Sequence, residues 1–203
     1  MTLGLLLVVA ALALAAYNLF EDRRAGESSA LVVERLAVSD TAYEAVGGED
    51  AGGASDAGAL AAQAISPETP MPTEAVDGSL YIGTLRIPSL GLELPIMSEW
   101  SDEGLRTAPC RYAGSAYSDD LVIAGHSYAS HFGGLGSVSY GAEVIFSDVR
   151  GNVFAYEVAS IEEIGAYEVE AMTESGWDLT LFTCTFDGSD RVAVRCKELV
   201  PEV

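Results

Sequence analysis

From residue 79 onward the chain consists of short apolar or alternating runs, each followed by turn-forming residues. They read YIGTLRI, LELPIM, DLVIAG, AEVIFSD, FAYEVASIEEI, DLTLFTCTF and RVAVRC. Short strands bounded by Gly, Asp and Ser clusters are typical of all-β sandwiches and barrels. The segment DVRGN at residues 148–152 predicts a hairpin between two of these strands. We therefore expect residues 78–203 to form one all-β domain.

The beginning of the chain is apolar instead of alternating. Leu3 to Phe20 carry no charged residue, and a helix of that length spans about 27 Å, close to the roughly 30 Å of a bilayer's hydrocarbon core. A cleaved signal peptide is the alternative, because the run is short and rich in alanine. Its apolar core, however, would normally have only about 7 to 15 residues. We expect residues 1–20 to be a retained single-pass transmembrane helix.

Residues 21–77 join this segment to the β domain. The run SSALVVERLAV at residues 28–38 predicts a short amphipathic helix. The rest is acidic and rich in Ala, Gly and Pro, and such a composition buries too little apolar surface to fold. We expect a flexible stalk that holds the β domain away from the membrane.

Charge and metal-ligand spacing exclude two classes of function. The chain has 10 basic and 31 acidic residues, a net charge of −21, which would repel a phosphate backbone and argues against a nucleic-acid partner. Three cysteines are too few for a disulfide framework, and none has CxxC spacing. His126 and His131 are five residues apart, whereas ligands on one helix face would be three or four apart. We expect no metal and no cofactor.

Three residues at strand ends could carry covalent chemistry. Cys184 ends the run DLTLFTCTF before a turn, and the returning run RVAVRC places Arg191 and Arg195 on one face by alternation. His126 follows the apolar run LVIAG, where Gly125 permits a close approach of the backbone. A nucleophilic cysteine needs such a histidine within reach. A lone cysteine after a strand is also commonly a small buried apolar residue, so the residues alone leave both interpretations open.

The same segments resemble a known family. LTLFTC followed by DRVAVR is similar to the sortase signature TLxTC with its downstream arginine, and VIAGHS is similar to the histidine-bearing strand end of that family. IGTLRIP followed by LELPI resembles the opening strands of sortase domains. The resemblance runs from about residue 79 to 199 and implies an eight-stranded closed barrel with short helices and loops.

The resemblance also implies an activity. Sortases are cysteine transpeptidases, formally endopeptidases of the hydrolase class, on the outer face of Gram-positive cells. They cleave an LPxTG-like C-terminal sorting signal of surface proteins and pass the acyl group to an amine of a peptidoglycan precursor or of a protein lysine. By position in the motifs, Cys184 matches the nucleophile, His126 the general acid and base, and Arg191, not Arg195, the arginine. Thr183 matches the threonine that helps to place the substrate.

The orientation in the membrane is a point of conflict. No Lys or Arg precedes the apolar run, while Arg23 and Arg24 follow it. The positive-inside rule would place these arginines in the cytoplasm. The resemblance implies the opposite, a catalytic domain outside the cell, and this is the localisation we expect.

The sequence leaves more than one sortase class and more than one mechanism open. TLFTCT with a nearby DR resembles the class B pattern, but only the 14 residues GAYEVEAMTESGWD precede the cysteine strand, where class B has a long helix. The last residues, KELVPEV, contain no apolar span of the kind expected in class C pilin polymerases. The class, the sorting motif and the acceptor amine are therefore open. Two other functions also remain: a thioacyl hydrolase with the same dyad, and a catalytically inactive membrane-tethered β-barrel binding module.

The remaining candidates are expected to be structural. We expect Cys110 in a loop before LVIAG and Cys196 pointing away from Cys184, with a disulfide between Cys110 and Cys196 left open. His131 is expected in a loop above Phe132 and Leu135. Trp100 and Trp177 could line a substrate groove, although partial burial is the commoner fate of tryptophan.

Overall fold

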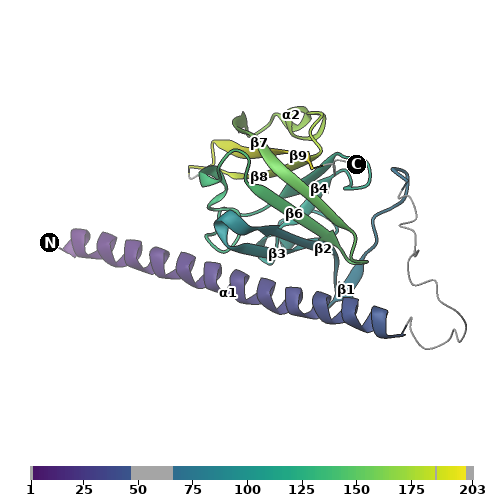
Figure 1. Cartoon of the computed structure of the whole chain (residues 1–203). Coiled ribbons are helices and arrows are strands. Elements are labelled where there is room, and N and C mark those ends of the chain that lie inside the picture. Colours follow the sequence, from purple (N-terminus) through teal and green to yellow (C-terminus); the bar gives the residue numbers. More distant parts are fainter. Residues whose placement is uncertain (1, 47–65, 186, 200–203) are drawn as a thin grey trace, which may run out of the picture.

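One long helix and one β domain make up the computed structural model, which describes residues 2–46, 66–185 and 187–199. The helix α1 (Thr2–Val46) is a long rod that runs along one side of the β domain, and its N-terminal part projects beyond that domain (Figure 1). Residues 47–65 of the expected stalk lie outside the described residues.

The β domain is a closed barrel, as the sequence predicts. Its strands are β1 (Glu74–Val76), β2 (Ser79–Ile87), β3 (Leu92–Met97), β4 (Cys110–Ala113), β5 (Leu121–Ala124), β6 (Glu143–Asp148), β7 (Val153–Gly165), β8 (Leu179–Cys184) and β9 (Asp190–Glu198). Eight of them follow one another in the order β2-β3-β4-β5-β8-β9-β7-β6, and pairing of β2 with β6 closes the ring. The short β1 pairs with the beginning of β2.

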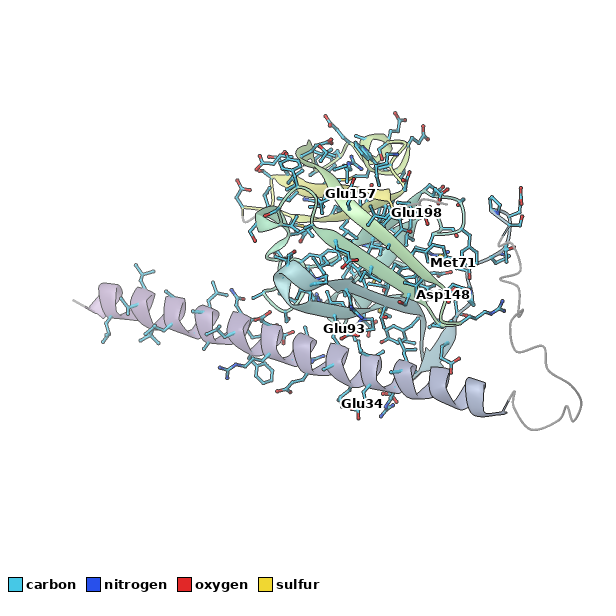
Figure 2. The ribbon with its side chains drawn as sticks, in the orientation of Figure 1. Glu34, Met71, Glu93, Asp148, Glu157 and Glu198 are labelled. Atoms are coloured by element: carbon cyan, nitrogen blue, oxygen red, sulfur yellow. The ribbon has the colours of Figure 1, made fainter. Side chains whose placement is uncertain are left out.

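The hairpin predicted at DVRGN is confirmed. β6 and β7 pair antiparallel, and the Asp148 N–H donates to the carbonyl of Asn152. The Asp148 carboxylate, at the end of β6 in Figure 2, accepts from the backbone N–H groups of Arg150 and Asn152. One carboxylate therefore satisfies the free donors of the turn.

The expected position of Cys110 is wrong. It lies in strand β4, where it pairs with Ala124 of β5, and not in a loop. β4 has only four residues, and three of them are half-buried, so the strand is too short to show an alternating pattern in the sequence.

The core lies inside the barrel. Alternation turns every second residue of each strand inward, and buried residues from all around the ring form one cluster, including Leu85, Ile96, Ile123, Phe146, Leu181 and Val194. Phe132 and Leu135, from the loop after β5, complete it.

The two halves of α1 differ. The side chains from Gly4 to Phe20 are exposed, and the helix contains a segment long and apolar enough to cross a membrane. Among residues 21–37, the buried side chains are Ala25, Ser29, Val32 and Leu36. Their spacing of four, three and four residues forms one stripe, and this stripe faces the barrel, whereas Glu34 lies on the opposite face (Figure 2).

The packed half of α1 belonged to the expected stalk. Val32 and Leu36 share a buried cluster with Val76, Tyr81 and Ala108 of the β domain. The short helix predicted at residues 28–38 is therefore part of a 45-residue helix.

Four short helices complete the described part of the fold. They are the 3-10 turns η1 (Pro88–Leu90), η2 (Gly104–Arg106) and η3 (Leu135–Ser137), and the helix α2 (Val169–Thr173) between β7 and β8. The segments that contain η2 and α2 line the pocket described below.

Candidate active site

Strand register explains why the candidate residues meet. β5 and β8 are parallel neighbours with Ala124 opposite Phe182, and the Gly125 N–H donates to the carbonyl of Phe182 at 3.0 Å. His126 and Cys184 each lie two residues beyond this pair, so both lie at the same end of the sheet. β9 runs antiparallel to β8 and places Arg191 directly opposite Cys184.

The ends of these strands surround a pocket of about 290 Å³. His126, Thr183, Cys184 and Arg191 all line it, so the structure brings together the four residues selected from the sequence. The other walls come from the η2 segment, β4 and the chain between β7 and β8, through Trp100, Asp102, Leu105, Tyr112, Gly165, Ala166, Glu168, Val169 and Met172.

Exposure separates the three thiols. Cys184 is partly exposed in the pocket, whereas Cys110 and Cys196 are fully buried. Burial raises the pKa of Cys110 to about 11 and the pKa of Cys196 to about 12, so both stay protonated at neutral pH. All three cysteines are free, and the disulfide left open between Cys110 and Cys196 does not form. Cys184 is the thiol that a substrate can reach.

The two arginines that alternation could not separate have different surroundings. Arg191 donates to the carbonyl oxygen of Asp190 at 3.0 Å and lines the pocket. Arg195 is only 1% exposed. Its guanidinium donates to Thr180 Oγ1 at 3.0 Å and pairs with Glu162 at 3.5 Å. The geometry favours Arg191 for a role in the pocket, while Arg195 supports the fold.

The network around Arg195 also fixes one wall of the pocket. Its guanidinium donates to the carbonyl oxygens of Ala171 and Met172 and to the Ser175 hydroxyl. These groups belong to α2 and the loop that follows, and Met172 lines the pocket. Burial lowers the pKa of Arg195, with Glu162 acting in the opposite direction.

His126 lies in a half-buried position at the rim. Its ring stacks on Tyr128, with the ring centroids 4.7 Å apart and the planes 29° apart. Burial lowers the pKa of His126, the positive charge of Arg106 lowers it further, and Asp102 partly opposes them. His126 is therefore mostly neutral at neutral pH, so it can accept a proton.

Gly125 allows the close approach that its position predicts. A Cβ atom there would lie 2.5 Å from the ring of Phe132. The loop also returns to this point, because the Phe132 N–H donates to the carbonyl of His126 at 3.0 Å. Any larger residue would push Phe132 out of the core and move His126.

His131 and the tryptophans can now be placed. His131 is fully buried in the loop, with Phe132 and Leu135 in the core beside it, as predicted. Trp100 lines the pocket and contacts Tyr112 edge to face, with centroids 6.1 Å apart. Trp177 does not line this pocket, and the Lys197 ammonium lies 5.1 Å from its ring centroid.

Several pocket residues had no signal in the sequence. Tyr112 belongs to the short β4, and Val169 and Met172 belong to the segment around α2, so only the folded chain places them beside Cys184. Thr183 is 4% exposed, and its Oγ1 has no hydrogen-bond partner within the described residues. Among residues 2–46, 66–185 and 187–199, no group of three or more His, Cys, Asp or Glu side chains is arranged to hold a metal ion.

A partly exposed thiol, a neutral imidazole and a guanidinium around one pocket can perform nucleophilic acyl transfer.

A family model described as Sortase domain matches residues 85–199, more than half of the chain. No curated protein matches the chain in sequence.

Solved structures share the fold. Sortase A from Corynebacterium diphtheriae is 23% identical with a TM-score of 0.55, over 61% of this chain and 63% of that one. Sortase C from Streptococcus pneumoniae is 26% identical with a TM-score of 0.53, over 59% and 69%. Clostridium perfringens sortase C with the C-terminal cell wall sorting motif is 21% identical with a TM-score of 0.52, over 59% and 71%. The chain thus spans less than two thirds of the first of these proteins.

Proposed function

Because the chain belongs to the sortase family, we propose that it is a cysteine transpeptidase. It cleaves an LPxTG-like C-terminal sorting signal and transfers the new acyl group to an amine on the cell wall or on another surface protein. One observation carries the proposal: the ends of β5, β8 and β9 bring His126, Cys184 and Arg191 to a single pocket. A Clostridium perfringens sortase C structure that includes a sorting motif supports a peptide of this kind as the substrate.

The first step is acylation. His126 takes the proton of the Cys184 thiol, and the resulting thiolate attacks the carbonyl carbon of the scissile peptide bond and forms a carbon–sulfur bond. The carbon–nitrogen bond breaks, and the His126 imidazolium gives its proton to the departing amine. The second step reverses these roles: an incoming amine attacks the thioacyl group, His126 takes its proton, and Cys184 leaves as the thiolate.

Arg191 and Thr183 assist this chemistry. The Arg191 guanidinium is fixed by the carbonyl oxygens of Gly188 and Asp190 and lies across from Cys184. From there its charge stabilises the oxyanion that develops on the substrate carbonyl. Thr183 has a buried hydroxyl without a protein partner in the described part of the chain. Thr183 lines the pocket next to the nucleophile, which supports the role in substrate placement that its motif position implies.

We place the enzyme in the cell membrane as a single-pass protein with the barrel outside. The exposed apolar half of α1, from Gly4 to Phe20, serves as the membrane anchor. Residues 78–203 are the catalytic domain, and residues 21–77 are the connection to the anchor, of which the second half of α1 and β1 pack against the barrel.

The two rival functions make different predictions. A binding module requires neither a reachable thiol nor a histidine and an arginine beside it, so the convergence in one pocket supports an enzyme. A thioacyl hydrolase would use the same residues, with water in place of the amine. Only the fate of the acyl group separates it from a transpeptidase.

The test uses the full chain in detergent micelles with a panel of sorting-signal peptides, with and without an added amine such as triglycine. We expect cleavage of at least one peptide and a new amide product when the amine is present. Cleavage to the free acid at an unchanged rate with and without amine would indicate the hydrolase. No cleavage of any peptide by the folded chain would favour the binding module.

A further inference from the structure

The loop after His126 folds back on itself. The Tyr128 carbonyl accepts from the N–H groups of His131 at 3.0 Å and Gly133 at 2.8 Å. The Phe132 N–H returns to the His126 carbonyl. The loop from His126 to Phe132 is therefore one compact unit, and a contact at its tip can reach the His126 ring.

The helix α1 contacts the tip of this loop at Ser130. The Asp22 carboxylate accepts from the Ser130 N–H at 2.9 Å, and the Ser130 hydroxyl lies 2.8 Å from the same carboxylate and 2.9 Å from the Asp22 carbonyl. Gly26, one turn later, has no side chain, and a Cβ there would lie 3.1 Å from the Ser130 Cβ. Both backbones are thus close together at this point.

A second contact lies one turn further along α1. The Ser29 hydroxyl is 3.5 Å from His131 Nε2 and donates to the carbonyl of Thr107 at 3.3 Å. Ser29 and His131 are both buried. The loop tip is therefore enclosed between α1 and the barrel.

Aromatic contacts connect the loop tip with the catalytic histidine. Tyr128 stacks on the His126 ring at 4.7 Å and contacts the His131 ring at 5.5 Å. The path from α1 runs from Asp22 and Ser29 to Ser130 and His131, then through Tyr128 to the ring of His126.

We propose that α1 is part of the active site's support: Asp22 fixes the loop through Ser130, and Tyr128 holds the His126 ring by stacking. Asp22, Ser130 and Tyr128 are positioning residues, because they act on the reaction only through His126. This inference rests on the proposed function. It means that the same helix that reaches toward the membrane also sets the geometry of the general acid and base.

The test follows the imidazole of His126 directly by NMR titration. The chain has only two histidines, so histidine-labelled full chain in micelles gives two signals, which His126→Gln assigns. The variants are Asp22→Ala and Ser130→Ala, with Glu27→Ala as the matched control. Glu27 is an exposed acid on the same helix, so its loss changes the charge of α1 without touching the loop.

We expect Asp22→Ala and Ser130→Ala to raise the pKa of His126 toward its ordinary value, because a released loop exposes the ring to water. Glu27→Ala leaves the pKa unchanged. Loss of the Asp22 charge alone would lower a histidine pKa, so a rise has to come from the released loop. The groups that face His126 in the pocket stay in place in every variant: Asp102, Arg106, Glu168, Cys184 and Arg191.

Tyr128 provides a second test that leaves the α1 contacts untouched. Tyr128→Phe keeps the stacked ring and should titrate like the wild type, whereas Tyr128→Leu should raise the pKa of His126. With a peptide that the wild type cleaves, Ser130→Ala and Tyr128→Leu should lower kcat by roughly tenfold and leave KM unchanged, as expected for a misplaced catalytic group.

The outcomes separate this inference from the proposed function. An unchanged His126 titration in folded Asp22→Ala, Ser130→Ala and Tyr128→Leu would overturn the inference, even if the wild type processes peptides. A wild type that processes no peptide would overturn the proposed function, while the titrations, which need no substrate, still report on the contact between α1 and His126.

Discussion

At the scale of single residues, the exposure of each thiol decides which cysteine can react. Cys184 is partly exposed in the pocket, whereas Cys110 is fully buried. We expect Cys184→Ala to abolish product formation without a large loss of stability, since truncation of a partly exposed side chain usually costs little. Cys110→Ala is the matched control. It should retain activity and lose about 1 kcal/mol of stability from the cavity.

This prediction is checked with peptide turnover and urea unfolding of both variants. Product from Cys184→Ala would refute the assignment of the nucleophile. Loss of turnover in a folded Cys110→Ala variant would show that the buried thiol is required.

Replacement of Arg191 should reduce activity, whereas replacement of Arg195 should reduce stability. Arg191→Ala should slow acylation by roughly 100-fold or more, as the loss of one oxyanion donor does, and leave unfolding nearly unchanged. Arg195→Ala leaves the Thr180 hydroxyl and the carbonyl oxygens of Ala171 and Met172 without this donor, and each buried polar group left unsatisfied costs about 1 to 3 kcal/mol. Stopped-flow acylation and thermal unfolding separate the two effects. Equal losses of stability would contradict the division of roles.

The residues at the strand ends could be found from the sequence for a physical reason. Alternation along two adjacent strands allows Arg191 to face Cys184, the family motif selects it, and the pairing register places it directly opposite Cys184. Alternation gives Arg195 the same face. The register excludes Arg195, because Arg195 lies opposite Thr180 and not opposite Cys184, and its guanidinium is buried among Ala171, Met172 and Ser175. In the sequence, only the spacing of the family motif separates the two arginines.

At the scale of elements, closure of the barrel depends on Gly83. β6 pairs with β2 here, and a Cβ on Gly83 would lie 2.0 Å from the Ser147 carbonyl oxygen. Gly83→Ala should therefore destabilise the barrel by about 3 kcal/mol, the upper end of the usual cost of overpacking. Gly134→Ala is the control, because a Cβ there has its nearest contact at 3.8 Å. Urea unfolding of both variants is the measurement, and equal midpoints would disprove the role of Gly83.

His131, in the loop after His126, should make the stability of the protein depend on pH in the acid range. Burial lowers the pKa of His131 from 6.5 to about 4, so the unfolded chain binds more protons between these pH values. Stability is therefore complete above about pH 6.5 and falls as the pH decreases toward 4, by about 3 kcal/mol in total. His131→Gln should show a flatter dependence in this window. Parallel curves for wild type and variant, measured by urea unfolding at several pH values, would contradict the prediction.

The elements differ in how well the sequence predicts them. The long strands show clear alternation, and the turn at DVRGN has its own local signal, so these were predictable. β4 was not, because its four residues are too few for a periodic signal. The length of α1 was also missed. Its first half is apolar all round, and its second half has one narrow buried stripe, so the change of pattern resembled the end of one element.

At the scale of the whole molecule, α1 contributes to the stability of the barrel. Its stripe buries Val32 and Leu36 against Val76, Tyr81 and Ala108. Burial of two such side chains stabilises the fold by about 3 kcal/mol. A chain that lacks residues 1–66 should be less stable by this amount than a chain that lacks residues 1–20. Urea unfolding of both truncated chains measures the difference. Equal stability would show that the second half of α1 is only a tether.

The same packing gives the molecule a fixed layout. One continuous helix extends from the exposed apolar segment to the loop that carries His126 (Figure 1). The site therefore keeps a defined position relative to the apolar half of α1.

The most direct test of the account is the intact mass of the full chain after incubation with an LPxTG-type peptide, followed by peptide mapping and an amine chase. We predict a thioacyl adduct on Cys184 that the amine converts to a new amide. The same adduct should be absent in His126→Ala. An adduct on another residue, or no adduct from a folded chain whose Cys184 resists alkylation, would contradict the central claim that Cys184 and His126 form the catalytic pair.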